Sequence, residues 1–115
     1  DVFREGRYAM DGQLKRGLLE VCVLAAIKTG DSYGYQIIKD MKPYLALSES
    51  TLYTVLKRLE AAELLTVRTA EHNGRLRKYY HITEAGRQRL EEFKVEWKEI
   101  LAVYQFVTRE DQGNK

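Results

Sequence analysis

Residues 65–82 read LTVRTAEHNGRLRKYYHI, and this stretch decides the fold. Residues 65–69 alternate apolar and polar side chains, and residues 78–82 are rich in aromatic and β-branched ones, as strands are. Between these runs lies the dipeptide Asn73-Gly74. It indicates a two-residue turn, because a type I′ turn needs a positive φ at both central residues. The stretch therefore predicts a β-hairpin.

Three helices are predicted before the hairpin. The first begins near Leu14, where apolar residues start to recur at helical spacing, and ends at the Lys-Thr-Gly sequence of residues 28–30. The Asp-Ser pair at residues 31–32 is expected to cap the second, which Pro43 ends. Ser48 is expected to cap the third.

A last helix follows the hairpin, capped by Thr83 and running from about Glu84 to Val107. Three short helices, a hairpin and a closing helix form the layout of a winged helix-turn-helix domain, an α+β fold. We expect this domain over residues 14–83, a C-terminal dimerisation helix over 84–108 and a flexible tail over 109–115. Residues 1–13 show no periodicity and are expected to be a disordered extension, or residues added for expression ahead of Met10 as the native start.

The third helix has the side chains that a recognition helix needs. Opposite its apolar stripe lie three short hydroxyl side chains, one aromatic hydroxyl and two cations: Ser50, Thr51, Thr54, Tyr53, Lys57 and Arg58. Such groups can read base edges or hold phosphates when a helix enters the major groove. An ordinary amphipathic helix with a solvated polar face explains this helix alone equally well.

The hairpin favours the DNA-binding interpretation. Its turn, Asn73-Gly74, is followed by the cations Arg75, Arg77 and Lys78, which can neutralise phosphates beside the groove. The chain has a net charge of only +2, but residues 57–89 hold eight Lys and Arg against four Glu, a net +4. A basic cluster is often just a solvated surface, so its place at a hairpin tip is what indicates a DNA-binding wing.

The last helix carries a seam of apolar residues spaced 3, 4, 3, 4 and 3 apart: Leu90, Phe93, Trp97, Ile100, Tyr104 and Val107. A core this small cannot cover so long a seam, so we expect part of it, with Leu101, to pack on a second copy. Leu14 and Leu18 are the expected partners, and a two-fold dimer predicts a pseudo-palindromic operator. The alternative is a helix folded back on its own domain.

Trp97 is the only tryptophan and lies beside Phe93 within this seam. Dimer packing is the simpler explanation. The other is a ligand site, in which the two Trp97 side chains of a dimer, with Phe93, sandwich a planar aromatic compound.

An ordered set of short motifs resembles the PadR-type transcriptional regulators. It comprises Tyr33-Gly34-Tyr35 with Ile37-Ile38-Lys39, Ser50-Thr51-Leu52-Tyr53, Leu56-Lys57-Arg58-Leu59-Glu60, Gly74-Arg75, Arg77-Lys78-Tyr79-Tyr80 and Thr83-Glu84-Ala85-Gly86. Many members carry proline where this chain has Thr54. The resemblance implies a homodimeric repressor of the short branch, without a larger C-terminal domain. It adds Tyr35 and Lys39 to the DNA contacts and supports a planar drug or phenolic compound bound at Trp97.

Other classes of function find no support in the sequence. One Cys and two separated His cannot supply a structural zinc site, and there is no phosphate-binding glycine loop, so we expect no metal or cofactor. No catalytic arrangement is visible, and no run is long and apolar enough to span a membrane. A single Cys, Cys22, suits a cytoplasmic protein. The alternative to a DNA-binding regulator is a winged helix used only for protein–protein contact.

Overall fold

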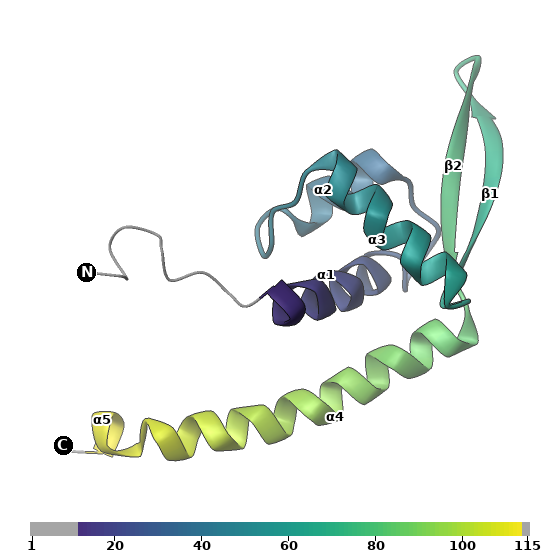
Figure 1. Cartoon of the computed structure of the whole chain (residues 1–115). Coiled ribbons are helices and arrows are strands. Elements are labelled where there is room, and N and C mark those ends of the chain that lie inside the picture. The colour runs from purple at the N-terminus through teal and green to yellow at the C-terminus, as the bar shows by residue number, and fades with distance from the viewer. Residues whose placement is uncertain (1–11, 114–115) are drawn as a thin grey trace.

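The computed structural model describes residues 12–113 and has the predicted three helices, hairpin and long helix, followed by a short helix that was not predicted (Figure 1). Residues 1–11 of the expected extension lie outside the described residues, whereas Gly12 and Gln13 already belong to the first helix. The elements are α1 (Gly12–Ala26), α2 (Gly34–Met41), α3 (Glu49–Ala61), β1 (Leu65–His72), β2 (Arg75–Ile82), α4 (Glu84–Val107) and α5 (Arg109–Gly113).

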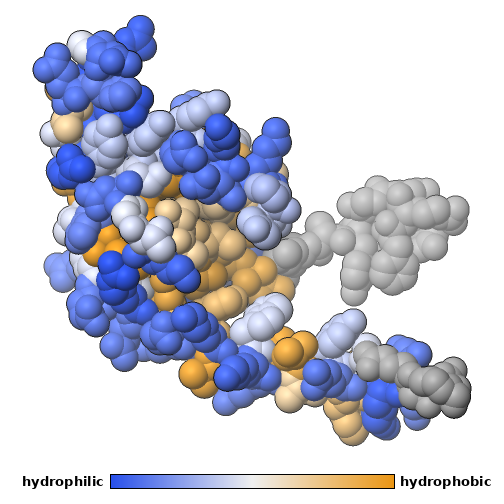
Figure 2. Space-filling model, turned by 180° about the vertical axis from the view of Figure 1, so that it is seen from behind, coloured by the Kyte–Doolittle hydropathy of each residue, from blue (hydrophilic) through white to orange (hydrophobic). Residues whose placement is uncertain are grey.

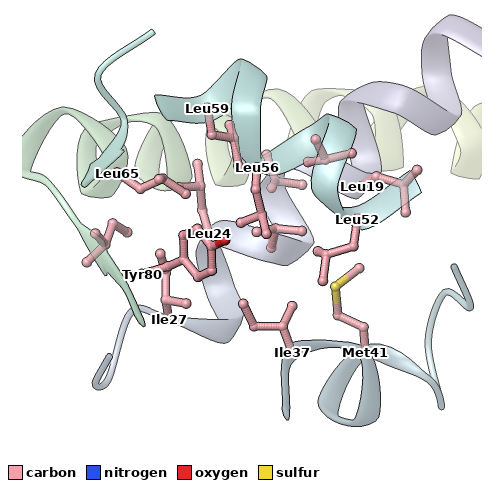
Figure 3. Packing of buried hydrophobic residues seen from close by; sticks show 14 of the residues in the cluster. Leu19, Leu24, Ile27, Ile37, Met41, Leu52, Leu56, Leu59, Leu65 and Tyr80 are labelled. Atoms are coloured by element: carbon pink, nitrogen blue, oxygen red, sulfur yellow. The ribbon is translucent and has the colours of Figure 1, made fainter. Parts of the chain in front are cut away.

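The core lies where the apolar faces of α1, α2 and α3 meet the base of the hairpin (Figure 3). Leu24 from α1, Ile37 from α2 and Leu52 from α3 are fully buried there. Leu65 and Tyr80 bring the two strands onto the same cluster. Burial of these apolar side chains is the main force that holds the elements together.

The hairpin has the predicted turn. β1 and β2 pair antiparallel from Leu65↔Ile82 to His72↔Arg75, which leaves two residues in the loop. Asn73 has φ of 53° and Gly74 has φ of 79°, so both occupy the left-handed region that a type I′ turn requires. Ser32 adds a short bridge to Tyr80, and a helical domain with this small antiparallel sheet confirms the winged-helix fold.

Two predicted helix caps are confirmed and one is wrong. The Ser48 hydroxyl accepts the Thr51 backbone N–H at 3.2 Å, and the Thr83 hydroxyl accepts that of Gly86 at 3.0 Å. The Asp31-Ser32 pair does not cap α2, whose N-cap residue is Tyr33. The reason is that the Ser32 backbone is held in its bridge to Tyr80, so that α2 starts only at Gly34.

α4 begins on the domain and then runs past it (Figure 1). Gly86 and Leu90 in its first turns are buried, and the residues from Lys94 onward are exposed. The chain continues as the short helix α5, where a flexible tail was expected; Glu110 and Asp111 in its first turn favour that helix start. No helix within residues 12–113 is both long and apolar enough to cross a membrane.

Candidate nucleic-acid interface

A trough of about 730 Å³ separates the wing from the starts of α2 and α3. We use "wing" for the hairpin of β1 and β2. The trough gathers residues that the sequence predicted as DNA contacts from three separate elements: Tyr35, Tyr53, Asn73, Arg75, Arg77 and Lys78. Lys39 is exposed on α2, and Gly74 is exposed at the wing tip beside the trough.

The predicted polar face of α3 is exposed, and its hydroxyl groups bond to one another. Ser48 donates its hydroxyl hydrogen to Thr51 Oγ1 at 3.0 Å and lies 3.2 Å from the Ser50 hydroxyl. Thr54 donates to the Ser50 backbone carbonyl at 3.1 Å, so its hydroxyl hydrogen is engaged while its oxygen can still accept. Lys57 is also exposed, so this face offers hydroxyl oxygens and a cation to a ligand.

Arg58 lies at the edge of the polar face of α3, on the flank toward α1. Its Nε donates to Glu20 Oε2 of α1 at 2.9 Å, and its side chain is half-buried. Thr51 and Thr54 share this flank, because Arg58 follows them by seven and four positions along the helix. The role of Arg58 as a DNA contact stays a prediction, with one N–H group already engaged.

The three wing cations differ in their surroundings. Arg75 and Lys78 are exposed, whereas Arg77 is half-buried with its guanidinium carbon 3.8 Å from the centre of the Tyr33 ring. Arg77 Nη1 also donates to the Tyr79 hydroxyl at 3.3 Å. Because Tyr33 is the N-cap of α2, this cation–π contact joins the wing to α2 and sets one wall of the trough.

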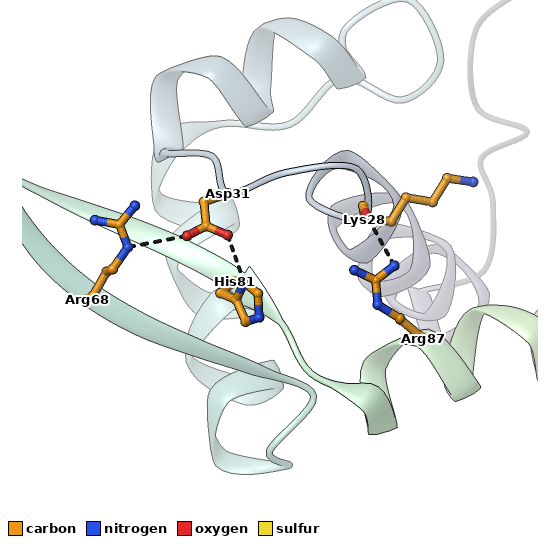
Figure 4. Close-up of polar contacts among 5 residues, drawn as sticks. All are labelled: Lys28, Asp31, Arg68, His81 and Arg87. Atoms are coloured by element: carbon orange, nitrogen blue, oxygen red, sulfur yellow. Dashed lines mark hydrogen bonds and ion pairs between the residues drawn. The ribbon is translucent and has the colours of Figure 1, made fainter.

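A polar cluster fixes the base of the wing (Figure 4). Asp31 accepts from Arg68 Nε at 3.3 Å and lies 2.8 Å from His81 Nδ1, so one carboxylate contacts both strands. The hydrogen bond with His81, followed by that with Arg68, holds the pKa of Asp31 below its usual value. In the same view Arg87 Nη1 of α4 donates to the Lys28 carbonyl at 3.0 Å, which links α4 to the end of α1.

Gly34 has a role in the site that sequence reasoning missed. A Cβ at this position would lie 3.0 Å from the Tyr53 hydroxyl oxygen, so the missing side chain lets Tyr53 lie against α2. The sequence shows this position only as a glycine between two tyrosines at a helix start. The packing of α3 on α2 explains why a glycine is needed there.

A second exposed region follows α4 and the start of α1. The exposed fractions are 49% for Leu14, 42% for Trp97 and 49% for Ile100, and Figure 2 shows hydrophobic side chains at the surface of both the domain and the projecting helix. These side chains, with Leu18 and Phe93, line a hollow of about 160 Å³ between the two helices. Leu101 and Tyr104 are also exposed.

Leu90 does not belong to this exposed surface. It is 8% exposed and packs in the core of its own domain, so the prediction that it joins the dimer seam is wrong in this respect. The first turns of α4 pack directly on the domain, and the residues of the seam become exposed to solvent only in the later part of the helix. Sequence reasoning also missed Val95, Val103 and Phe106, which lie outside the 3–4 spacing and are exposed.

Phe93 and Trp97, the predicted ligand contacts, stack on each other with ring centres 5.7 Å apart. Glu96 and Arg89 lie on the same hollow, with Glu96 Oε1 3.5 Å from Arg89 Nη1. One face of Trp97 is therefore covered within the chain, and a carboxylate is close by. Among the described residues, no three His, Cys, Asp or Glu side chains gather to hold a metal ion.

Known proteins resemble this chain over most of its length. The model of the transcriptional regulator PadR-like family matches residues 23–92. A protein of Lysinibacillus sphaericus, named only as uncharacterized protein X, is 36% identical over 93 residues, 76% of this chain and 85% of that one.

Solved structures are similar as well. A PadR family transcription regulator of Clostridium difficile has 33% identity and a TM-score of 0.72, covering 77% of this chain and 97% of that one. Bacillus subtilis PadR, in complex with operator DNA, has 25% identity and a TM-score of 0.64, covering 68% of this chain and 47% of that one.

Proposed function

The chain belongs to the PadR-like family of transcriptional regulators, and from this we propose that it binds operator DNA as a homodimeric repressor. The observation that carries the proposal is the trough between α3 and the wing. Its walls bring an exposed hydroxyl-bearing helix and the exposed cations Arg75 and Lys78 to one side of the domain. The operator complex of Bacillus subtilis PadR supports the same kind of partner.

In the proposed complex α3 enters the major groove, and the wing lies along the phosphate backbone of the DNA. Ser50, Tyr53 and Thr54 face base edges, and Lys57, Arg75 and Lys78 face phosphates. Arg77 acts mainly by positioning the wing against Tyr33, as their 3.8 Å stacking favours. Tyr35 and Lys39 extend the DNA-contacting surface along α2. Asn73 and Gly74, at the wing tip, contact the phosphate backbone of the DNA.

The test is the salt dependence of binding to duplex DNA. Each phosphate contact contributes about −0.9 to the slope of log K against log salt. We expect Arg75→Ala with Lys78→Ala to make that slope less steep by about 1.8 for each protomer bound, about 3.6 for the dimer, on operator and mixed-sequence DNA alike. Tyr53→Phe should instead weaken operator binding more than mixed-sequence binding. Binding that does not depend on salt or on the wing cations would contradict the proposal and favour a protein partner.

The homodimer in this proposal is built on the exposed seam of α4. The apolar side chains Trp97, Ile100, Leu101 and Tyr104 are exposed, and a partner surface would remove them from water. A two-fold pairing there places two recognition helices for a pseudo-palindromic operator.

The repressor is proposed to release DNA when a planar aromatic ligand enters beside Trp97. The open face of Trp97 suits a planar aromatic compound, and the paired charges of Arg89 and Glu96 lie on the same hollow. Because Trp97 is the only tryptophan, quenching of its fluorescence by a planar cationic dye reports binding at this place. We expect quenching together with weaker operator binding. Unchanged fluorescence up to the solubility limit of the dye would contradict the ligand site and leave the DNA-binding proposal standing.

A further inference from the structure

α3 has a second hollow on the flank opposite the wing. It measures about 270 Å³ and lies between α3 and the beginning of α1. Thr51, Thr54 and Arg58 line it from α3, and Lys15 and Arg16 line it from α1. The wing-side trough instead takes Glu49 and Tyr53 from α3. The exposed face of α3 is thus bordered by cations on both sides.

The charges in this second hollow favour an anion. Lys15 and Arg16 are exposed, and neither has an ion pair with any residue in the described part of the chain. The nearby carboxylate of Glu20 is occupied by Arg58 at 2.9 Å. The two cations of α1 are therefore available to a partner, while the third is held in place by Glu20.

We infer that Lys15 and Arg16 form a second phosphate-binding element, which holds the DNA backbone on the flank of α3 away from the wing. The inference rests on the proposed entry of α3 into the major groove. That groove is about 12 Å wide and has a phosphate backbone along each edge. A wing on one flank can neutralise only one of these backbones, and the start of α1 is the basic surface beside the other.

This arrangement gives the second hollow a defined part in recognition. Contacts to both backbones fix the depth and angle of α3 in the groove, although they read no bases themselves. Thr51 and Thr54 belong to the exposed face of α3 and line the same hollow as the α1 cations, so a phosphate held there sets their position directly.

The test compares Lys15→Ala with Arg16→Ala against the double variant Lys28→Ala with Lys98→Ala. The control removes the same charge from exposed positions after the end of α1 and on α4, and neither lysine has an ion pair within the described residues. Affinity for a mixed-sequence duplex and for a selected operator is measured over a range of salt concentrations. We expect the α1 variant to make the slope less steep by about 1.8 for each protomer bound, about 3.6 for the dimer, and to weaken both complexes by about one to two orders of magnitude per protomer near 0.1 M salt. The control should bind like the wild type.

The outcomes separate this inference from the function on which it rests. If the wild type binds no DNA, both are overturned. If the wild type binds DNA and the wing variant (Arg75→Ala with Lys78→Ala) is impaired, but the α1 variant binds like the wild type, only the present inference is overturned. Light scattering and thermal unfolding accompany each variant. If the α1 variant loses binding because its oligomeric state changes, the cations act between protein copies and the inference is also overturned.

Discussion

At the scale of single residues, Gly86 shows how closely α4 approaches the domain. A Cβ there would lie 2.3 Å from the Leu64 carbonyl oxygen and 2.7 Å from Ile82 Cγ1. The first of these neighbours is backbone, which cannot move aside easily. The start of α4 is therefore set by a contact that leaves no room for any side chain.

Gly86→Ala should lower the free energy of unfolding by about 1–3 kcal/mol, the usual cost of overpacking. Urea denaturation measures the change. Gly30→Ala is the matched control, because a Cβ at Gly30 meets nothing within 4 Å, and its effect should stay within about 0.5 kcal/mol. Equal effects of the two substitutions would contradict the close contact at α4.

Asp31 makes the free energy of unfolding depend on pH. Its pKa is lowered in the folded chain by His81 and then Arg68, so its ionised form stabilises the fold above the ordinary carboxyl pKa of about 4. That stabilisation is lost as the pH falls through the lowered pKa. Wild type should therefore exceed Asp31→Asn in unfolding free energy at about pH 6, and the gap should close toward about pH 3. Asp40→Asn, at an exposed carboxyl on α2, is the control, and a gap that stays constant over this range would contradict the assignment.

At the scale of elements, local signals in the sequence were sufficient for much of the fold. The Asn73-Gly74 turn, the Ser48 and Thr83 caps and the limits of α4 depend on neighbours within a few residues, and all were predicted. The contacts around the site residues could not be predicted in this way. Arg58 pairs with Glu20 across 38 positions and Asp31 contacts His81 across 50, and no periodicity reports contacts of that range.

The wing is the element that should respond most locally to mutation. Gly74 has φ of 79°, where a side chain costs about 1–2 kcal/mol. Most of the hairpin near the turn is exposed, so Gly74→Ala should open the tip without unfolding the core. Amide exchange at the tip should quicken, while exchange in α1 stays unchanged. Loss of protection throughout the domain would instead mean that the wing and core unfold as one unit.

At the scale of the whole molecule, the later part of α4 leaves the apolar side chains of its seam exposed to solvent. The 3–4 spacing of apolar residues predicted this exposed surface correctly along its later part. It could not predict that Leu90 would be buried in its own domain, because spacing along a helix does not show where the rest of the fold ends. The proposed packing of this surface against a second copy has a direct test.

Ile100→Glu should shift the protein from dimer to monomer in sedimentation experiments, because a carboxylate in an apolar seam would lose its hydration. Operator affinity should fall much more than affinity for mixed-sequence DNA, since each monomer keeps its own wing. Gln105→Glu introduces the same charge at an exposed position off the seam and should remain dimeric. A dimeric Ile100→Glu variant would show that the copies meet elsewhere.

The uninterrupted length of α4 makes it a stiff connection between the domain and the far end of the helix. After Gly86 the helix contains no glycine or proline, so it joins the buried Leu90 to the exposed Val107 as one stiff lever, about 25 Å long at 1.5 Å per residue. A tilt of about 10° at one end moves the other by about 4 Å, which exceeds the rise of one base pair, about 3.4 Å. The spacing between two operator half-sites that such a dimer accepts is therefore governed by the angle at which its two levers cross.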